Sequence, residues 1–171
     1  MCPAVLLASS RPNGNTRALV EMTLPPNSFD LVDLSALRIG YYSYSNENAG
    51  DDFIPLIEKL VACPLWIIAT PLYWYTMSAQ AKTFLDRISD LLSTRKDLGR
   101  QLRGKQLAVL CCGTDPSAPD SFDEPFALSC QYLGMVFAGT HYAQFEGRAP
   151  ALPDTPQLAV DFGRELLSES T

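Results

Sequence analysis

Polar residues crowd into one turn near the start of the chain, directly after an apolar segment. The turn is Ser9-Ser-Arg-Pro-Asn-Gly-Asn-Thr16, which offers hydroxyl groups, side-chain amides and one guanidinium. We predict a buried strand at Val5–Ala8 before it and a short helix at Asn15–Met22 after it. Because a helix N-terminus has free N–H groups and a partial positive charge, this turn suits an anion, most often a phosphate. Arg11 can add two parallel hydrogen bonds to such a group.

The same residue types are also common in turns that bind nothing, where Thr16 could simply cap the helix. Seven such residues directly after a buried strand favour the phosphate interpretation. The spacing excludes other phosphate loops, because neither G-x-x-x-x-G-K-[ST] nor a G-x-G-x-x-G after the first strand occurs. A phosphatase loop would need a cysteine in the turn, and the turn has none.

Three consecutive aromatic residues, Tyr73, Trp74 and Tyr75, follow another apolar segment, Leu65–Ala69. Three adjacent side chains cannot all point into one core, and ligands of a parallel sheet lie beyond the carboxyl ends of its strands. A flat ring would suit these residues, although a core cluster or a subunit contact would also explain them. Together with the polar turn, they predict a ligand with a phosphate at one end and an aromatic ring at the other.

Apolar segments alternate with helical patterns along the chain, and this alternation predicts the elements that position both loops. The predicted strands are Val5–Ala8, Ser28–Leu34, Leu65–Ala69, Leu107–Cys112 and Met135–Thr140. The predicted helices are Asn15–Met22, Asp52–Cys63, Ser78–Ser93, Phe122–Leu133 and Leu158–Leu167. Strands separated by helices indicate an α/β fold with a doubly wound parallel sheet.

The composition fits one folded domain over residues 1–171, with 47% hydrophobic and 19% charged residues. The net charge of -6 argues against nucleic acid or an anionic membrane as the main partner. No apolar run reaches the length of a membrane span and no signal peptide is recognisable, so we expect a cytoplasmic location. The five cysteines have no metal-binding spacing, and their odd number does not suit a disulfide framework. No metal site is predicted.

Two segments together resemble the NAD(P)H-dependent FMN reductase and iron–sulfur flavoprotein group: SSRPNGNT (9–16) and TPLYWYTMSAQAKTFLDR (70–87). They are similar to the phosphate loop of that group and to the segment beside its flavin ring. The likeness extends through most of the chain, including Leu133-Gly-Met135. The resemblance implies a flavodoxin-like, doubly wound, five-stranded parallel sheet of order 2-1-3-4-5 with helices on both faces.

The resemblance also implies FMN as the cofactor and NAD(P)H as the co-substrate. The residues that it implies for the FMN phosphate are Ser9, Arg11, Asn13, Asn15 and Thr16. The residues that it implies around the isoalloxazine ring are Pro71, Leu72, Tyr73 and Trp74, with Gly113 and Thr114 at the ring border. A small residue such as Gly113 would let the backbone approach the ring edge.

Other residues receive weaker interpretations. Cys111 and Cys112 are interpreted as buried small side chains, although a vicinal pair invites a redox role. His141 is interpreted as structural. On the third helix, Lys82 and Asp86 are predicted to form an exposed pair. Asp86 and Arg87 match an Asp-Arg pair of the family and could serve a subunit contact.

The sequence departs from the group at two places. Ala8 stands where the group usually has glycine, and Ile39–Asp52 lacks the cysteines that hold a cluster in the iron–sulfur members. Because a cluster needs about four thiolates close together, we predict a cluster-free flavoprotein. Tyr41, Tyr42 and Tyr44 occupy this region instead and could cover the flavin, meet another subunit or lie in a solvated loop.

These observations lead to the hypothesis of an oxidoreductase that passes electrons from NAD(P)H through FMN to a small-molecule acceptor such as a quinone or a flavin. The cofactor supplies the chemistry, so no side chain is assigned a catalytic role. A non-enzymatic FMN electron carrier and a flavin-free relative that binds a partner are the alternatives. The surplus of aromatic residues predicts a homodimer or homotetramer.

Overall fold

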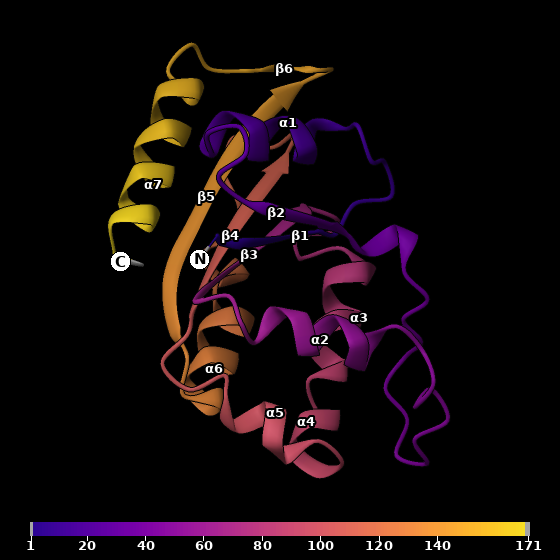
Figure 1. The fold of residues 1–171 in the computed structure, drawn as a ribbon. Coiled ribbons are helices and arrows are strands. Elements are labelled where there is room, and N and C mark those ends of the chain that lie inside the picture. The colour runs from indigo at the N-terminus through magenta and orange to yellow at the C-terminus, as the bar shows by residue number, and fades with distance from the viewer. Residues whose placement is uncertain (1, 170–171) are drawn as a thin grey trace.

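The computed structural model describes residues 2–169 and consists of a central sheet with helices on both faces (Figure 1). The strands are β1 (Ala4–Leu7), β2 (Asp30–Asp33), β3 (Leu65–Pro71), β4 (Gln106–Gly113), β5 (Val136–Glu146) and β6 (Ala149–Pro150). The α-helices are α1 (Asn15–Thr23), α2 (Phe53–Leu60), α3 (Ala79–Arg87), α4 (Asp90–Ser93), α5 (Lys96–Arg100), α6 (Glu124–Leu133) and α7 (Thr155–Glu169). Two short 3₁₀ helices are η1 (Leu34–Ala36) and η2 (Asp120–Phe122).

The strands lie in the order β2-β1-β3-β4-β5-β6, and the first five run parallel. This arrangement confirms the predicted α/β class and the order 2-1-3-4-5. The predicted number of five strands is wrong, because β6 pairs antiparallel with the end of β5, where Phe145 lies opposite Pro150. A two-residue strand is too short for an alternation pattern to reveal it. Strand β5 also continues to Glu146, six residues beyond the predicted end at Thr140.

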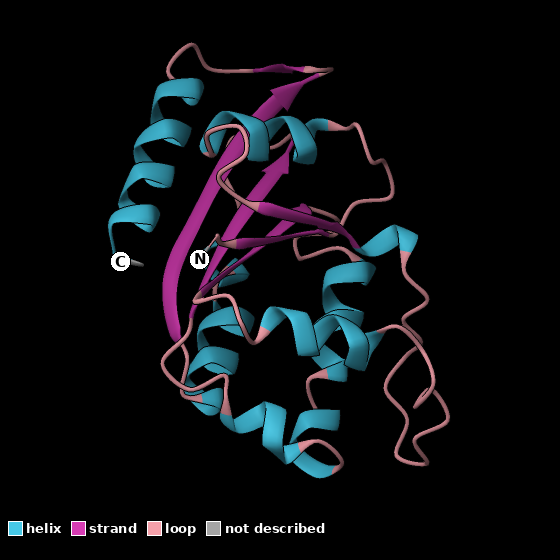
Figure 2. Cartoon of the chain, in the orientation of Figure 1, coloured by secondary structure: helices cyan, strands magenta, loops and turns pink. Residues whose placement is uncertain are grey.

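The predicted long helix Ser78–Ser93 is divided into α3 and α4. The division is made by tighter turns, in which the N–H of Ile88 donates to the Leu85 carbonyl and the N–H of Ser89 donates to the Asp86 carbonyl. Hydrophobic periodicity did not show this break, because the apolar side chains on either side of it still face the same core. Helix and loop segments of this part of the chain are distinguished in Figure 2.

Two hydrophobic cores lie on opposite faces of the sheet. Helices α1 and α7 cover one face and α2 to α6 cover the other (Figure 1). Every residue of β3 is buried, as expected for a central parallel strand. Its alternate side chains separate cleanly, with Trp66 and Ile68 in one core and Leu65 and Ile67 in the other.

None of the helices formed by residues 2–169 is both long and apolar enough to cross a bilayer.

The contact between α1 and α7 leaves no space for a side chain at Gly163. A Cβ atom placed there would lie 1.9 Å from the backbone oxygen of Thr23. The Thr23 hydroxyl donates to the Leu19 carbonyl at 2.8 Å within α1, so this end of α1 is held firmly. The missing side chain of Gly163 therefore sets the distance between the two helices.

We expect Gly163→Ala to lower the free energy of unfolding by about 1–3 kcal/mol, the usual cost of overpacking. The loss should occur although alanine is the better helix former. Gly50→Ala is the matched control, because a Cβ atom at Gly50 would meet nothing within 4 Å. Urea unfolding of both variants tests the expectation, and equal effects on the two free energies would contradict it.

Candidate functional site

Three loops meet at the carboxyl edge of the sheet, because they follow three neighbouring parallel strands. Residues 8–14 follow β1, residues 72–78 follow β3 and residues 114–119 follow β4. Backbone hydrogen bonds continue the pairing past the strand ends, from Ala8 N–H to the Ala69 carbonyl at 2.8 Å and from Leu72 N–H to the Cys112 carbonyl at 2.7 Å. The polar turn and the aromatic segment are therefore neighbours, as the sequence predicted.

The polar turn leads into α1, which begins without a side-chain cap. Its N-cap residue is Gly14, so Thr16 does not cap the helix. Since the first N–H groups of a helix have no partner within it, α1 presents free donors at this edge. The Thr16 hydroxyl lies 3.4 Å from the Cys112 sulfur and is buried.

The side chains of the turn differ in their freedom to bind a ligand. Arg11 and Asn13 are exposed, and Arg11 forms no ion pair with any residue that the structure describes. Ser9 is buried, and its hydroxyl oxygen accepts from the Arg11 N–H at 3.3 Å. Asn15 donates its Nδ2 to the Gly147 carbonyl at 2.9 Å, which anchors the start of α1 to the β5–β6 turn. A free guanidinium beside uncapped amides fits a phosphate group.

The aromatic segment forms a tight turn with unusual backbone geometry. Tyr73 and Thr76 exchange two backbone hydrogen bonds of 2.9 and 3.1 Å around Trp74 and Tyr75. Both central residues have positive φ, at 49° and 66°, a conformation that such turns normally give to asparagine and glycine. Trp74 is 92% exposed and Tyr75 68%. Strained backbone of this kind concentrates at functional sites, so this turn is a candidate ligand contact.

Ser78 holds the base of the aromatic turn against β1, and the sequence analysis assigned it no role. Its hydroxyl donates to the Ala8 carbonyl at 2.7 Å and accepts from the Ala81 N–H at 3.2 Å, which caps α3. Its own N–H donates to the Thr70 hydroxyl at 2.9 Å. A serine directly before a helical pattern is the signal that could have identified the cap.

The third loop is fixed by side chains of β5. The Tyr142 hydroxyl donates to the Asp115 carbonyl at 2.7 Å, and Gln144 Nε2 donates to the Thr114 carbonyl at 2.9 Å. Burial raises the pKa of Tyr142 to about 12. A Cβ atom at Gly113 would lie 2.7 Å from the Tyr142 hydroxyl and 3.2 Å from Leu72. Contacts inside the protein thus already favour glycine at this position.

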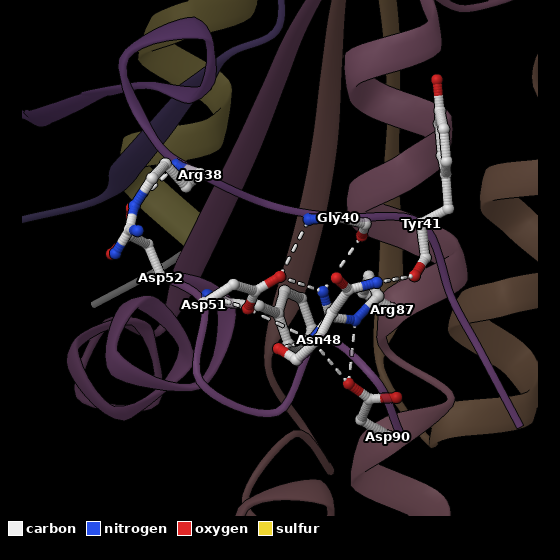
Figure 3. A network of polar contacts seen from close by, with 9 residues as sticks. Arg38, Gly40, Tyr41, Asn48, Asp51, Asp52, Arg87 and Asp90 are labelled. Carbon is white, nitrogen blue, oxygen red and sulfur yellow. Dashed lines mark hydrogen bonds and ion pairs between the residues drawn. The ribbon is translucent and has the colours of Figure 1, made fainter. Parts of the chain in front are cut away.

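A buried arginine connects α3 to the segment before α2 (Figure 3). Arg87 is 1% exposed, forms an ion pair with Asp51 and donates Nε to Asp90 at 2.8 Å. Its guanidinium lies 4.7 Å above the Phe53 ring. The predicted subunit contact of Arg87 is therefore wrong, because its own chain encloses it.

The segment from residue 40 to residue 51 closes around this arginine. Arg87 Nη1 donates to the Gly40 carbonyl at 3.0 Å, and the Gly40 N–H donates to Asp51 at 2.8 Å. Asp51 also accepts from the Phe53 N–H at 2.9 Å. Burial alone would raise the pKa of Asp51, but its hydrogen bonds to Arg87 and the two N–H groups lower it below the ordinary 3.8. These contacts fix the segment to α3.

The two vicinal cysteines and the histidine singled out in the sequence are packed inside the fold. Cys111 and Cys112 are buried and burial raises the pKa of both thiols, which confirms their interpretation as small core side chains. His141 stacks on Phe162 of α7, with 5.6 Å between the two ring centroids, and burial lowers the pKa of His141. Within residues 2–169, no three His, Cys, Asp or Glu side chains are grouped so as to hold a metal ion.

The exposed pair predicted on α3 is confirmed, since Lys82 Nζ lies 2.6 Å from the carboxylate of Asp86 and both side chains are exposed. Helix α3 therefore carries ion pairs of opposite burial, those of Arg87 with Asp51 and Asp90 inside the protein and that of Lys82 at its surface. The buried and the exposed pairs should contribute differently to stability.

Comparison with known proteins gives matches over most of the chain. The family model "NADPH-dependent FMN reductase" matches residues 1–148. YwqN of Bacillus subtilis (strain 168), provisionally named an NAD(P)H-dependent FMN-containing oxidoreductase, is 29% identical over 177 residues, which cover 98% of this chain and 97% of YwqN.

Solved structures share the fold. The Trp repressor binding protein from Bacillus subtilis has a TM-score of 0.76 and 25% identity, covering 94% of this chain and 96% of its own. An NADPH-quinone reductase from P. pentosaceus has a TM-score of 0.66 and 17% identity, covering 96% of this chain and 97% of its own.

We expect Arg87→Met to lower the free energy of unfolding by about 3–5 kcal/mol, because it leaves buried carboxylates without a partner. Lys82→Ala is the matched control on the same helix and should cost less than about 1 kcal/mol, since its pair is solvated. Chemical denaturation at neutral pH measures both. A loss below 1 kcal/mol for Arg87→Met would show that the network contributes little.

Proposed function

The chain belongs to the NADPH-dependent FMN reductase family, and on that premise we propose that it passes electrons from NAD(P)H through FMN to a small-molecule acceptor such as a quinone or a flavin. The proposal depends chiefly on one observation, the adjacency of an uncapped polar turn at residues 9–16 and a strained aromatic turn at residues 73–76. Such an edge suits a ligand with a phosphate at one end and a flat ring at the other.

Each part of this edge receives a proposed role toward FMN. The proposed phosphate contacts are Ser9, Arg11, Asn13, Asn15 and Thr16, with the free N–H groups of α1 beside them. The proposed ring contacts are Pro71, Leu72, Tyr73 and Trp74, with Gly113 and Thr114 at the border. The cofactor, when bound, supplies the redox chemistry by accepting hydride and releasing electrons.

The chain's own residues contribute binding, orientation and the exclusion of water. Arg11 supplies the full positive charge that a phosphate requires. Trp74 projects from a backbone that the Tyr73–Thr76 hydrogen bonds hold rigid, so its ring is pre-positioned against a flat partner. Membership of a reductase family favours an enzyme over the electron carrier that the sequence alone left open.

We also propose a homodimer or homotetramer in which a second subunit covers part of this edge. Tyr41 and Tyr44 are 79% and 97% exposed, and Trp74 and Tyr75 add two further exposed rings. Large exposed apolar surfaces of a protein often mark contacts with a partner, and these rings could supply one. A cytoplasmic location is supported by the free thiols of all five cysteines.

We expect Arg11→Ala to weaken FMN binding by about 1.5–3 kcal/mol, the scale of a hydrogen bond to a charged group. The affinity for riboflavin, which lacks the phosphate, should not change. Arg17→Ala is the control. Arg17 lies inside α1, beyond the polar turn, and its Nε lies 2.6 Å from Glu21 Oε1. Fluorescence titration of the apoprotein measures both ligands, and equal losses for the two would contradict the assignment.

We expect the FMN-loaded protein to dissociate on dilution and to lose specific NAD(P)H oxidation activity in parallel. Tyr44→Ser should shift the dissociation to higher protein concentration. Tyr132→Ser, which removes another exposed ring, 76% exposed and near the C-terminal end of α6, should not. Sedimentation and activity assays across one dilution series test this, and a fully active monomer would refute it.

A further inference from the structure

The hairpin turn between β5 and β6 lies beside the start of α1, at the same edge of the sheet as the polar turn (Figure 1). Asn15, the first residue of α1, donates its Nδ2 to the Gly147 carbonyl of this hairpin at 2.9 Å. Arg148 is the next residue, and its side chain is exposed. The hairpin therefore brings an arginine to the start of α1 from a segment that lies 132 residues after Asn15.

The backbone of this hairpin is held on two sides. Strands β5 and β6 pair antiparallel around it, and Gly147 has a φ of 62°, the conformation that a two-residue hairpin turn often needs at its first position. The Ala151 N–H continues the pairing to the Gln144 carbonyl at 2.9 Å, and Gln144 Nε2 donates to the Thr114 carbonyl. Arg148 therefore extends from a backbone that is fixed relative to α1 and to the loop after β4, which lowers the ordering cost of binding a ligand.

The acidic residue of the hairpin faces away from α1. Phe145 packs in the core that α1 and α7 cover, and successive side chains of a strand point to opposite faces. Glu146 therefore lies on the other face of β5. The hairpin thus offers a cation to the start of α1 without placing a carboxylate there.

Arg11 and Arg148 are the two basic residues at this edge that form no ion pair with any residue between 2 and 169. The other basic residues without such a pair lie in segments that lead into β3 and β4, toward the opposite edge of the sheet: Lys59, Lys96, Arg100, Arg103 and Lys105. Because the chain carries a net charge of -6, attraction of an anion to the edge must come from such local groups.

We propose that Arg148 is a second phosphate-binding residue of the flavin site and donates hydrogen bonds to the phosphate of FMN together with Arg11. The inference rests on the proposed function, because it takes FMN as the ligand and residues 9–16 as its phosphate site. A phosphomonoester carries about 1.5–2 negative charges at neutral pH, so a second guanidinium adds attraction to that of Arg11. Arg11 precedes α1 and Arg148 is tied to its first residue, so the two flank the free N–H groups at which an anion would lie.

The proposal is tested by fluorescence titration of the apoprotein with FMN and with riboflavin. Arg148→Ala should weaken FMN about tenfold, the scale of a hydrogen bond to a charged group, and leave the affinity for riboflavin unchanged. Arg148→Lys should lose less, because it keeps the charge and loses only the planar fork of the guanidinium. Arg100→Ala is the matched control, since it removes one exposed, unpaired arginine from the end of α5 and should leave FMN affinity unchanged.

The dependence of FMN affinity on salt gives a second measurement. Salt screens the attraction between exposed charges, so the affinity of the wild-type protein should fall more steeply with salt than that of Arg148→Ala. The double variant Arg11→Ala/Arg148→Ala should prefer FMN over riboflavin less than either single variant does, because both guanidinium groups act on the same phosphate.

Unchanged FMN affinity in Arg148→Ala, equal losses for FMN and riboflavin, or an equal loss of FMN affinity in Arg100→Ala would overturn the proposal. Failure of the proposed function has a different signature, because a wild-type apoprotein that binds FMN no better than riboflavin has no phosphate site at all. A wild-type preference for FMN that Arg11→Ala reduces and Arg148→Ala does not would reject only the role of Arg148.

Discussion

Parallel pairing of β1, β3 and β4 is the constraint on which the proposed site depends. Adjacent parallel strands must end at the same edge, so the loops that follow them converge however far apart they lie in the sequence. Ser78 strengthens this convergence, because one hydroxyl both caps α3 and binds the backbone at the end of β1. The polar turn at residues 9–16 and the aromatic turn are thus fixed relative to one another by backbone and by a single buried side chain.

The buried Arg87 is the second organising feature, and it acts on a different part of the edge. It joins α3 to a segment about forty residues earlier, through Asp51 and through the Gly40 carbonyl. Taking these charges out of water is expensive, and good geometry with further hydrogen bonds is required to offset the cost. Here Asp90 and two backbone N–H groups provide them. The resulting network gives a loop with little regular structure a defined conformation beside the site.

The proposed site contains few reactive side chains of the protein itself. The described residues offer no metal-binding cluster, and the buried thiols have raised pKa values that disfavour thiolates. What the edge does offer is donors for an anion and aromatic surface for a ring. A protein that relies on its cofactor for redox chemistry needs its own residues to bind, orient and exclude water, and those are the roles that the geometry supports.

The sequence by itself determined the fold class and the positions of the two turns, because these depend on local patterns of apolar, polar and turn-forming residues. The strand order was implied by the resemblance of its two motifs to a known family. The sequence did not determine β6, the division of the third helix or the positive φ angles of Trp74 and Tyr75. It also did not reveal the surroundings of Arg87, which the resemblance suggested for a subunit contact and which the fold encloses. β6, the helix division and the aromatic turn are made by hydrogen bonds between near neighbours, which leave no periodic pattern in the sequence. The surroundings of Arg87 and Ser78 were decided by tertiary structure, because their partners are distant in the chain. Asp51 lies 36 residues before Arg87, and Ala8 lies 70 residues before Ser78. Only the folded arrangement of strands and helices brings such partners within hydrogen-bonding distance.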